Sequence, residues 1–332
     1  MGAQADLTAA AEPLRAELVV HCYRMLGSVT DAEDAVQETM LRAWRARDRY
    51  DAGRASVRTW LYKIATNVCL TALEGRPRRP LPSGLGAPST DPDATLRPDF
   101  EVPWLQPLPD AYLSRDRSDP ADRVTEQHSV RLALMASLQL LPPRQRAVLV
   151  LRDVLAFSAA EVAAQLEAST ASVNSALQRA RATLADAAPS EDELTDPEDP
   201  TIRATVERYI RAFEAADVAA LVDLLTADVV LEMPPVPLWY RGREDYGRFI
   251  ARVFRMRGPG WRMLPLRANG QPALAAYAPA CGGSLALHTL QVLTVGRSGI
   301  ACNVVFQDPA VFTAFDLSPL LDPGDWSEDE RH

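Results

Sequence analysis

The N-terminal part of the chain carries a helical pattern of apolar positions. LRAELVVHCYRML predicts an amphipathic helix that stops near Gly27, and Thr30 or Asp31 can cap the next helix, DAEDAVQETMLRAWRAR. YDAGRAS interrupts the pattern, and SVRTWLYKIATNVCLTALEG predicts a further helix that ends at Gly75. Apolar residues three and four apart are typical of helices that bury one face. We therefore expect residues 10–78 to form an all-helical domain.

A second helical stretch follows a segment without periodicity. Residues 79–122 are rich in Pro, Gly and Asp and are expected to be a linker, although EVPWLQPLPDAYL within them is apolar enough to dock on a neighbouring surface. Residues 123–186 are again helical. Their segment SAAEVAAQLEASTASVNSALQRAR predicts two short helices, the first capped by Ser158 and the second by Ser169 or Thr170. This pattern predicts a helix-turn-helix.

The pattern changes after residue 200. Two helices, a strand in DVVLEMP and a helix in GREDYGRFIARVFR precede four strand-like runs, RMLPLRA, PALAAYA, SLALHTLQVLTVG and IACNVVFQ. The breaks NG, CGG and RSG separate these runs, which predicts an α+β domain with antiparallel strands over residues 201–318. Acidic segments at 187–200 and 319–332 are expected to be a solvated linker and tail. The fold class is therefore multidomain, with two all-α domains and one α+β domain.

Composition narrows the classes of function. The length of 332 residues allows several domains, and the net charge of −9 excludes a protein that is basic throughout, though not a local basic face. The N-terminus MGAQADLTAAAEPLR has no basic region followed by an apolar core, and no apolar run reaches about 18 residues, so neither a secretory signal nor a membrane span is expected. Cys22, Cys69, Cys281 and Cys302 lack metal-ligand spacing with the four histidines, so a reduced, cytoplasmic chain without a metal site or cofactor is expected.

The outer face of the second helix of the helix-turn-helix carries groups that suit DNA. Asn174, Ser175 and Gln178 can reach base edges or sugar-phosphate oxygens. Arg179 and Arg181 can neutralise phosphates or read guanine. The alternative is a plain helical hairpin with a solvated polar face.

The first domain offers two further surfaces. The helix DAEDAVQETMLRAWRAR has an acidic outer face that is either solvated or docks on a basic partner. The helix SVRTWLYKIATNVCL interleaves aromatic and basic residues, which suits melted DNA whose bases can stack or be captured in pockets. The alternative is that Trp60, Leu61 and Ile64 belong to the core.

Two segments carry a resemblance to a known family. YRMLGSVTDAEDAVQETMLRAWR with TWLYKIATNVCLTAL resembles region 2 of extracytoplasmic-function sigma factors of RNA polymerase, and LPPRQRAVLVLRDVLAFSAAEVAAQLEASTASVNSALQRARATL resembles their region 4. The resemblance implies a non-catalytic subunit that directs core polymerase to promoters. It also implies that four residues dock on the clamp of the largest RNA polymerase subunit: Asp31, Asp34, Gln37 and Glu38.

The same resemblance implies residues for both promoter elements. A flipped base of the minus-ten element would enter a pocket beneath the loop Tyr50–Ser56. The minus-ten residues would be Tyr50, Arg54, Ser56, Arg58, Trp60, Tyr62, Lys63 and Asn67. The helix from Thr170 to Leu184 would read the minus-thirty-five element, and the upstream Arg144 and Arg146 could add phosphate contacts. The minus-thirty-five set is therefore Arg144, Arg146, Ser169, Thr170, Ser172, Asn174, Ser175, Gln178, Arg179 and Arg181.

The helix-turn-helix departs from the family at three positions. Glu167 occupies the turn position that usually holds glycine, and a turn with positive φ favours glycine, so the local backbone is expected to differ. Asn174 and Ala176 stand where bases are common. Each missing phosphate contact weakens binding and reduces its salt dependence.

The C-terminal domain resembles the cone-shaped SnoaL-like branch of the NTF2-like fold, which some sigma factors of this class carry as a regulator in cis. Trp104, Leu105 and Pro107 lie in a segment resembling a linker motif of those proteins and are expected to make an interdomain contact. A cavity for a small-molecule ligand would be lined by Tyr209, Phe213, Trp239, Tyr240, Phe249, Trp261, His288 and Phe306.

Two other functions remain open from the residues. A one-component regulator that senses a small molecule would bind duplex DNA without polymerase, but it has no use for a melting module. A cyclase-type enzyme with a DNA-binding appendage would pair His288 with Asp228 and Glu232 as acid and base, although no spacing specifies such a pair.

Overall fold

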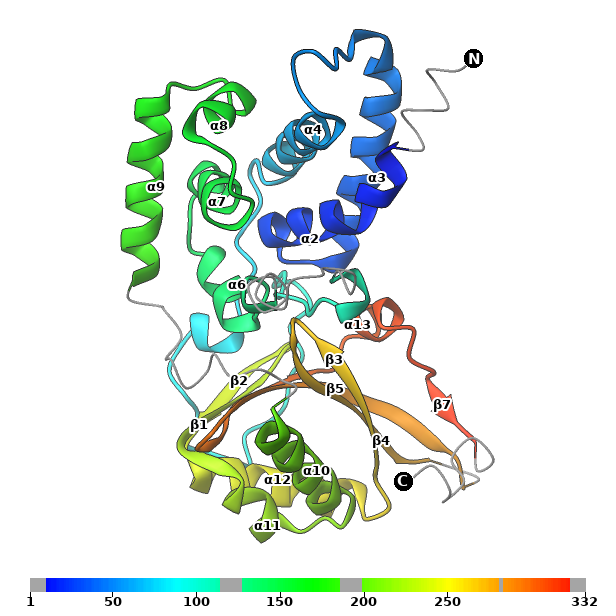
Figure 1. Ribbon diagram of the computed structural model, residues 1–332. Helices are drawn as coiled ribbons and strands as arrows, with labels where there is room; N and C mark the ends of the chain where they lie inside the picture. The colour runs from blue at the N-terminus through cyan, green and yellow to red at the C-terminus, as the bar shows by residue number, and fades with distance from the viewer. Residues whose placement is uncertain (1–9, 114–126, 186–198, 281–282, 323–332) are drawn as a thin grey trace. The chain divides into compact units, whose positions relative to one another are not determined.

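The computed structural model describes residues 10–113, 127–185, 199–280 and 283–322, and the chain divides into two compact units (Figure 1). The first unit comprises Met1–Arg79 and Leu105–Ala188, and the second comprises Pro80–Trp104 and Pro189–His332. The segment expected to be a linker is therefore shared between the two units. Its earlier part, Pro80–Trp104, belongs to the C-terminal fold.

The N-terminal helices begin and end at local signals. Gly27 terminates the first long helix with φ +71°, as expected. The cap of the next helix is Ser28, not Thr30 or Asp31, since its side chain accepts a hydrogen bond from the backbone N of Asp31 (3.2 Å). The elements are η1 (Glu12–Leu14), α2 (Arg15–Leu26), α3 (Val29–Ala46), η2 (Arg47–Arg49) and α4 (Val57–Ala72).

Gly27 is also closely packed by its neighbours within the first unit. Its carbonyl accepts a hydrogen bond from the backbone N of Gln106 (3.0 Å). A Cβ at this position would lie 3.0 Å from Nε2 of Gln139 and 3.1 Å from Cδ1 of Leu105. Both the positive φ and the close packing therefore require glycine here.

The helix-turn-helix is present, and its turn keeps the geometry of a glycine turn. Ser158 and Glu161 form a capping box, and Ser169 rather than Thr170 caps the second helix. Glu167 has φ +50°, and the N–H of Ala168 donates to the carbonyl of Ala163 (2.9 Å) in a Schellman arrangement. The elements are η4 (Asp110–Tyr112), α6 (Leu132–Leu138), α7 (Pro143–Leu149), the π-helical turn η5 (Val150–Val154), α8 (Ala159–Gln165) and α9 (Thr170–Ala185).

Replacing Glu167 with glycine is expected to stabilise the protein by about 1 kcal/mol, because a side chain at positive φ is strained. The carboxylate lies 3.6 Å from Nζ of Lys63, but it is 84% exposed, so its loss costs little. Thermal unfolding measures the gain. Glu167→Ala is the control, since it removes the carboxylate and keeps the strain; equal stability of the two variants would contradict the prediction.

His21 lies in the core between α2 and α4. Its side chain is fully buried, with Nε2 3.0 Å from Oγ1 of Thr66 and the ring edge-on to Tyr62. Burial, aided by the nearby positive charges of Arg24 and Arg58, lowers the pKa of His21 to about 3. The imidazole is therefore neutral in the folded protein at physiological pH.

The lowered pKa of His21 predicts that α2 and α4 loosen in acid. Since the unfolded chain binds the proton first, the stabilisation is complete above about pH 6.5 and is lost as the pH falls toward 3. Between pH 6.5 and pH 5 we expect a loss of roughly 2 kcal/mol. Amide protection of α2, corrected for intrinsic exchange, should fall in the wild type but not in His21→Leu. Equal pH dependence in both proteins would contradict this.

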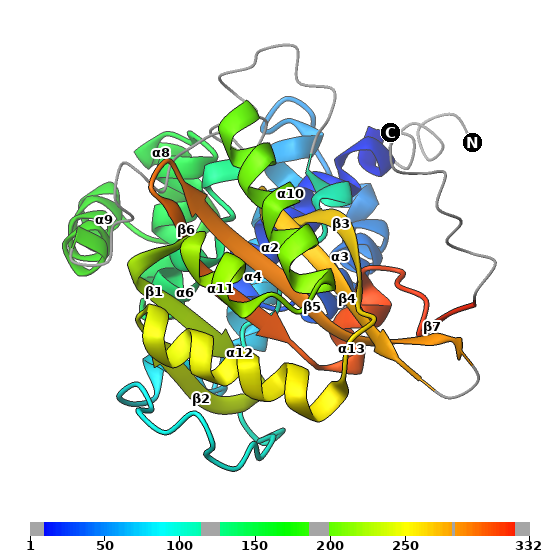
Figure 2. The same ribbon diagram turned by 90° about the horizontal axis from the view of Figure 1, so that it is seen from below.

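The second unit is a curved sheet with α10, α11 and α12 on one face (Figure 2). The strand order is β2-β1-β6-β5-β4-β3, and β7 pairs with β5. All pairs are antiparallel except β1 with β6, which is parallel. The expected α+β fold is confirmed, but the expectation of antiparallel strands throughout was wrong, and β2 was not anticipated.

These elements have the following bounds: η3 (Pro82–Gly84), α10 (Pro200–Glu214), α11 (Val218–Asp223), β1 (Leu225–Met233), β2 (Val236–Arg241), α12 (Arg243–Arg257), β3 (Arg262–Ala268), β4 (Gln271–Pro279), β5 (Leu285–Gly296), β6 (Gly299–Phe306), α13 (Pro309–Ala314) and β7 (Leu320–Leu321). The apolar core lies between the sheet and these helices, and Leu96 of the linker packs against it. Among the described helices, none is both long and apolar enough to cross a membrane. The acidic linker lies outside the described residues except for Asp199 and Pro200, and the acidic tail lies outside them after Asp322.

Candidate functional site

The acidic face of α3 is partly exposed and partly neutralised. Asp34 and Gln37 are exposed. Asp31 pairs with Arg79 (2.7 Å) and Arg76 (3.2 Å) from the chain that follows α4. Glu38 pairs with Arg42 one turn along the helix (2.6 Å), so Asp34 and Gln37 are the expected docking residues most open to a partner.

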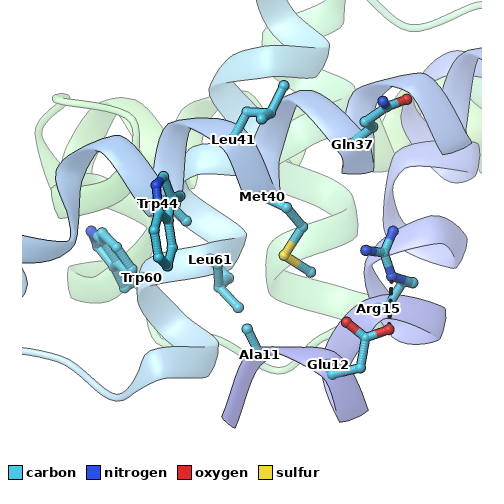
Figure 3. Close-up of a pocket in the computed structure, with 10 residues that line it drawn as sticks. Ala11, Glu12, Arg15, Gln37, Met40, Leu41, Trp44, Trp60 and Leu61 are labelled. Atoms are coloured by element: carbon cyan, nitrogen blue, oxygen red, sulfur yellow. Dashed lines mark hydrogen bonds and ion pairs between the residues drawn. The ribbon is translucent and has the colours of Figure 1, made fainter. Parts of the chain in front are cut away.

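A hollow of about 310 Å³ lies beside this face, between α3, α4 and η1 (Figure 3). Its walls are largely apolar, and Leu41 (45%) and Trp44 (50%) are exposed at its edge. Trp60, expected to read DNA, and Gln37, expected to dock on polymerase, both line it. No residue of the loop 50–56 does so, and the described hollow is therefore not the expected pocket beneath that loop.

The loop before α4 is held by its own side chains. The ring of Tyr50 lies 5.0 Å from the ring of Trp60, and its hydroxyl donates to the carbonyl of Ala55 (3.1 Å). Ser56 caps α4 by accepting from the N–H of Thr59 (3.1 Å), and Arg54 is exposed. The outer end of the expected minus-ten surface is thus open to a ligand.

The other face of α4 is covered by the helix-turn-helix part of the same unit, by which we mean residues 127–185 with helices α6 to α9. Tyr62, only 1% exposed, packs its ring 5.6 Å from that of Phe157. Lys63 faces Glu167 (3.6 Å), while Arg58 is held by Glu17 (3.1 Å) and lies over Tyr62.

In this structure, these contacts correct part of the minus-ten assignment. Tyr62 is a core residue here, and Arg58 is occupied by its carboxylate partner. Asn67 lines a second hollow, of about 820 Å³, together with Arg144 and Glu167. DNA could reach this face only if the helix-turn-helix moved away.

Arg146 does not lie on a DNA-facing surface, although the sequence placed it in the minus-thirty-five set. It is 3% exposed, and its guanidinium donates to the carbonyl of Met25 at the end of α2, to Oε1 (2.9 Å) and the carbonyl of Gln139, and to the carbonyl of Leu141. Burial lowers its pKa to about 10, so it stays charged at neutral pH. Arg146 therefore fastens α7 to α2.

The expected DNA-facing residues of α9 are exposed, but two bases have partners. Arg181 forms a two-pronged ion pair with Asp153 of η5 (2.9 and 2.7 Å), and Arg144 donates to the carbonyl of Leu166 (2.8 Å). Arg179 donates to Oγ of Ser175 on its own helix (2.7 Å). The exposed members of the minus-thirty-five set are Arg144, Ser169, Thr170, Ser172, Asn174, Ser175, Gln178, Arg179 and Arg181.

The linker segment Pro80–Trp104 is bound along the second unit by hydrogen bonds to its backbone. Nε1 of Trp239 donates to the carbonyl of Gly86 (2.9 Å), and the hydroxyl of Tyr240 donates to the carbonyl of Asp91 (3.1 Å). Nη1 of Arg252 donates to the carbonyls of Pro92 (2.9 Å) and Ala94 (2.8 Å). Trp239 and Tyr240, expected to line the cavity, instead hold the linker.

The boundary between the units falls inside the expected contact segment. Trp104 belongs to the second unit, where its Nε1 donates to the carbonyl of Asp99 (2.7 Å). Leu105 belongs to the first unit and is fully buried beside Gly27, and Pro107 is buried too. The carbonyl of Gln106 accepts a hydrogen bond from the hydroxyl of Tyr23 (2.7 Å).

A cavity of about 220 Å³ lies in the second unit. Of the expected lining residues, Phe213, Phe249, Trp261 and His288 line it. Phe306 does not, because side chains alternate along β6 and Asn303 and Val305 take the cavity side. Tyr209 is buried in a polar network with Tyr246, Gln291 and Asn303 at the cavity wall.

His288 reaches the cavity through an irregularity of β5. Ala276 pairs with Thr289, whereas Tyr277 pairs with Leu287, so His288 is an extra residue in β5. Such a bulge turns adjacent side chains to one face, and both His288 and Thr289 line the cavity. Beyond the bulge, Thr289 and Gln291 rather than Leu290 face the cavity.

The expected acid–base pair is not assembled around His288. Asp228 is exposed, and Glu232 is buried with its carboxylate accepting the N–H of Ser83 (2.8 Å). Neither residue lines the cavity. Burial, with a smaller effect of Arg257, lowers the pKa of His288 to about 4.

Asn303, Gln291 and Tyr246 were missed from the sequence. For Asn303 and Gln291 the signal was a polar residue inside an otherwise apolar strand, as in IACNVVFQ and SLALHTLQVLTVG, whereas Tyr246 lies on α12.

Comparisons with known proteins cover most of the chain. Three family models match: “Sigma-70 region 2” over residues 11–79, “Sigma-70, region 4” over 131–184 and “SnoaL-like domain” over 206–301. ECF RNA polymerase sigma factor SigG of Mycobacterium tuberculosis is 50% identical over 318 residues, 95% of this chain and 85% of the relative. SigJ of that organism is 31% identical over 93% of both chains. The crystal structure of SigJ matches with a TM-score of 0.63 at 26% identity, over 94% of this chain and 100% of that chain.

Proposed function

The chain belongs to the extracytoplasmic-function sigma factors of RNA polymerase, with a SnoaL-like C-terminal domain, and we propose from this membership how its surfaces are used. The acidic face of α3 docks on the clamp of the largest polymerase subunit. The loop Tyr50–Ser56 and α4 melt and read the minus-ten element, and α9 reads the minus-thirty-five element in the major groove. The core enzyme in the cytoplasm supplies the catalysis, and the sigma chain supplies base contacts.

We further propose that the C-terminal domain regulates these surfaces in cis. One observation supports this proposal of regulation. The face of α4 that bears Tyr62, Lys63 and Asn67 packs against the helix-turn-helix part of the first unit. A sigma factor whose two DNA-reading parts are closed on each other cannot span two separate promoter elements. Opening of this contact is therefore a step toward promoter binding.

The linker supplies the means of control. It joins α4 to α6, and its Pro80–Trp104 segment is held by Trp239, Tyr240 and Arg252 of the C-terminal fold. While that segment is held, less chain is free to let the two DNA-reading parts separate. Release of the segment lengthens the tether, and the C-terminal domain thereby sets the balance between closed and open forms.

Run-off transcription with purified core polymerase on genomic fragments tests the sigma function. We expect promoter-specific transcripts from the full chain, and a loss of at least about tenfold with Asp34→Arg, because it opposes docking electrostatically. Glu244→Arg makes the same charge change on α12 and is the matched control. No transcript, together with tight duplex binding in the absence of polymerase, would favour a one-component regulator instead.

A further inference from the structure

The N-terminal end of α3 is contacted by two segments of the first unit that are separated in the sequence. One comprises residues 76–79, which follow α4, and the other comprises residues 105–113, which contain η4. Between them the chain runs through Pro80–Trp104, the segment that belongs to the second unit. Both ends of that segment are therefore continuous with residues bound to the helix that is proposed above to dock on polymerase.

The first of these segments occupies Asp31. Oδ2 of Asp31 accepts hydrogen bonds from Nη2 of Arg79 (2.7 Å) and from Nη1 of Arg76 (3.2 Å). The side chains of Asp31 and Arg79 are only 25% and 19% exposed, so solvent screens this ion pair less than it screens a fully exposed one. A basic partner that binds Asp31 therefore competes with both guanidinium groups.

The second segment occupies Glu33, one turn before Gln37 on the same helix. The hydroxyl of Tyr112 in η4 donates a hydrogen bond to Oε1 of Glu33. Burial, aided by this hydrogen bond, raises the pKa of Tyr112 to about 12, so the hydroxyl keeps its proton at neutral pH. Gln106 holds the same segment at the start of α3, because its Oε1 accepts from Oγ of Ser28 (2.8 Å).

These contacts reduce the negative charge that α3 presents to a partner. Asp31 and Glu33 are two carboxylates, and the guanidiniums of Arg76 and Arg79 place two positive charges beside them. Attraction between oppositely charged surfaces steers association and favours the correct partner. A basic surface is thus attracted more strongly to this end of α3 once the arginines have moved away.

We propose that residues 76–79 and Tyr112 compete with the clamp of the largest polymerase subunit for Asp31 and Glu33. The two linker ends thereby weaken docking until they are displaced. By linkage, polymerase bound to these carboxylates weakens the attachment of the linker ends to α3. This competition rests on the docking of α3 proposed above, and it is separate from the closure of the two DNA-reading parts on each other.

Binding of the full chain to purified core polymerase, measured by biolayer interferometry at fixed salt, tests the competition. We expect Arg76→Ala combined with Tyr112→Phe to bind about threefold to tenfold more tightly than the wild type, because a partly exposed ion pair and one hydrogen bond are removed. The matched control is Arg248→Ala with Tyr277→Phe, which removes one guanidinium and one hydroxyl from the second unit.

The control variant should bind core polymerase as the wild type does. Melting curves establish that both double variants fold. If the folded Arg76→Ala, Tyr112→Phe variant binds no more tightly than the control, the proposal is overturned.

Asp31→Asn shows whether the gain passes through the contested carboxylate. In this background Arg76→Ala should no longer tighten binding, because the group for which the arginine and polymerase compete is gone. An undiminished gain would mean that only the net charge matters, and it would overturn the competition at Asp31.

Asp34→Arg separates a failure of the competition from a failure of docking. If Asp34→Arg weakens binding to core polymerase but the Arg76→Ala, Tyr112→Phe variant does not tighten it, α3 docks without competition from the linker ends. If Asp34→Arg binds as tightly as the wild type, the docking of α3 is refuted, and the competition is refuted with it.

Discussion

Replacing Arg146 with alanine is expected to release the helix-turn-helix from α2 and α4. The buried guanidinium bonds to the carbonyl of Met25 and to three acceptors at Gln139 and Leu141. Its removal leaves these acceptors in a dry site, and breaking such a buried charged network costs about 3 kcal/mol. Hydrogen exchange should therefore rise in α4 around Lys63 and Asn67, and sigma-dependent transcription should increase.

The matched control is Arg144→Ala on the same helix. It removes an exposed guanidinium that donates to the carbonyl of Leu166, and it should leave α4 protected. Arg146→Lys keeps the charge but loses the planar fork, so an intermediate effect is expected. Equal protection of α4 in Arg146→Ala and Arg144→Ala would refute the conclusion that Arg146 holds α7 against α2.

Releasing the linker from the C-terminal fold is expected to raise transcription by at least about tenfold, since loss of roughly 1.4 kcal/mol already shifts a two-state equilibrium that far. Trp239→Ala combined with Arg252→Ala removes the side-chain bonds to the carbonyls of Gly86, Pro92 and Ala94. It also removes the buried ring of Trp239, which is 9% exposed. Run-off transcription measures the activity, and limited proteolysis within Pro80–Trp104 measures release.

Arg248→Ala is the control for this experiment. Arg248 lies on α12 one turn before Arg252 and pairs with Asp245 of its own helix (3.4 Å), so its loss should leave the linker in place. If the double variant releases the linker and transcription stays unchanged, the linker does not transmit control. If the linker stays protected, these two side chains do not hold it.

Deletion of residues 200–332 is a less selective test than these substitutions. Leu81, Pro82 and Pro92 of the linker segment are buried in the second unit, and Leu96 packs against its core. Truncation would expose these apolar side chains and add an aggregation risk to any change in activity. Substitution at Trp239 and Arg252 leaves the fold that buries them in place.

The predicted DNA-binding residues show which features can be inferred from the sequence and which cannot. The outer surface of α9 followed from helical periodicity, because a helix that buries Val173, Ala176, Leu177 and Ala180 turns its polar residues outward. Arg146 has the same chemistry as Arg144 and lies two residues away, yet one is buried and the other exposed. The two residues lie on different sides of α7, and the sequence does not show that the side bearing Arg146 meets the distant end of α2 at Met25.

Local signals in the sequence determined the helices, the stop at Gly27, the caps Ser158 and Ser169 and the helix-turn-helix, because each depends on neighbours within a few residues. Tertiary structure decided the parallel pairing of β1 with β6, the bulge at His288, the burial of Tyr62 and Arg146, and the division of the linker between two units. These features depend on which distant surfaces meet. Periodicity reveals that a face is apolar, but not which partner covers it.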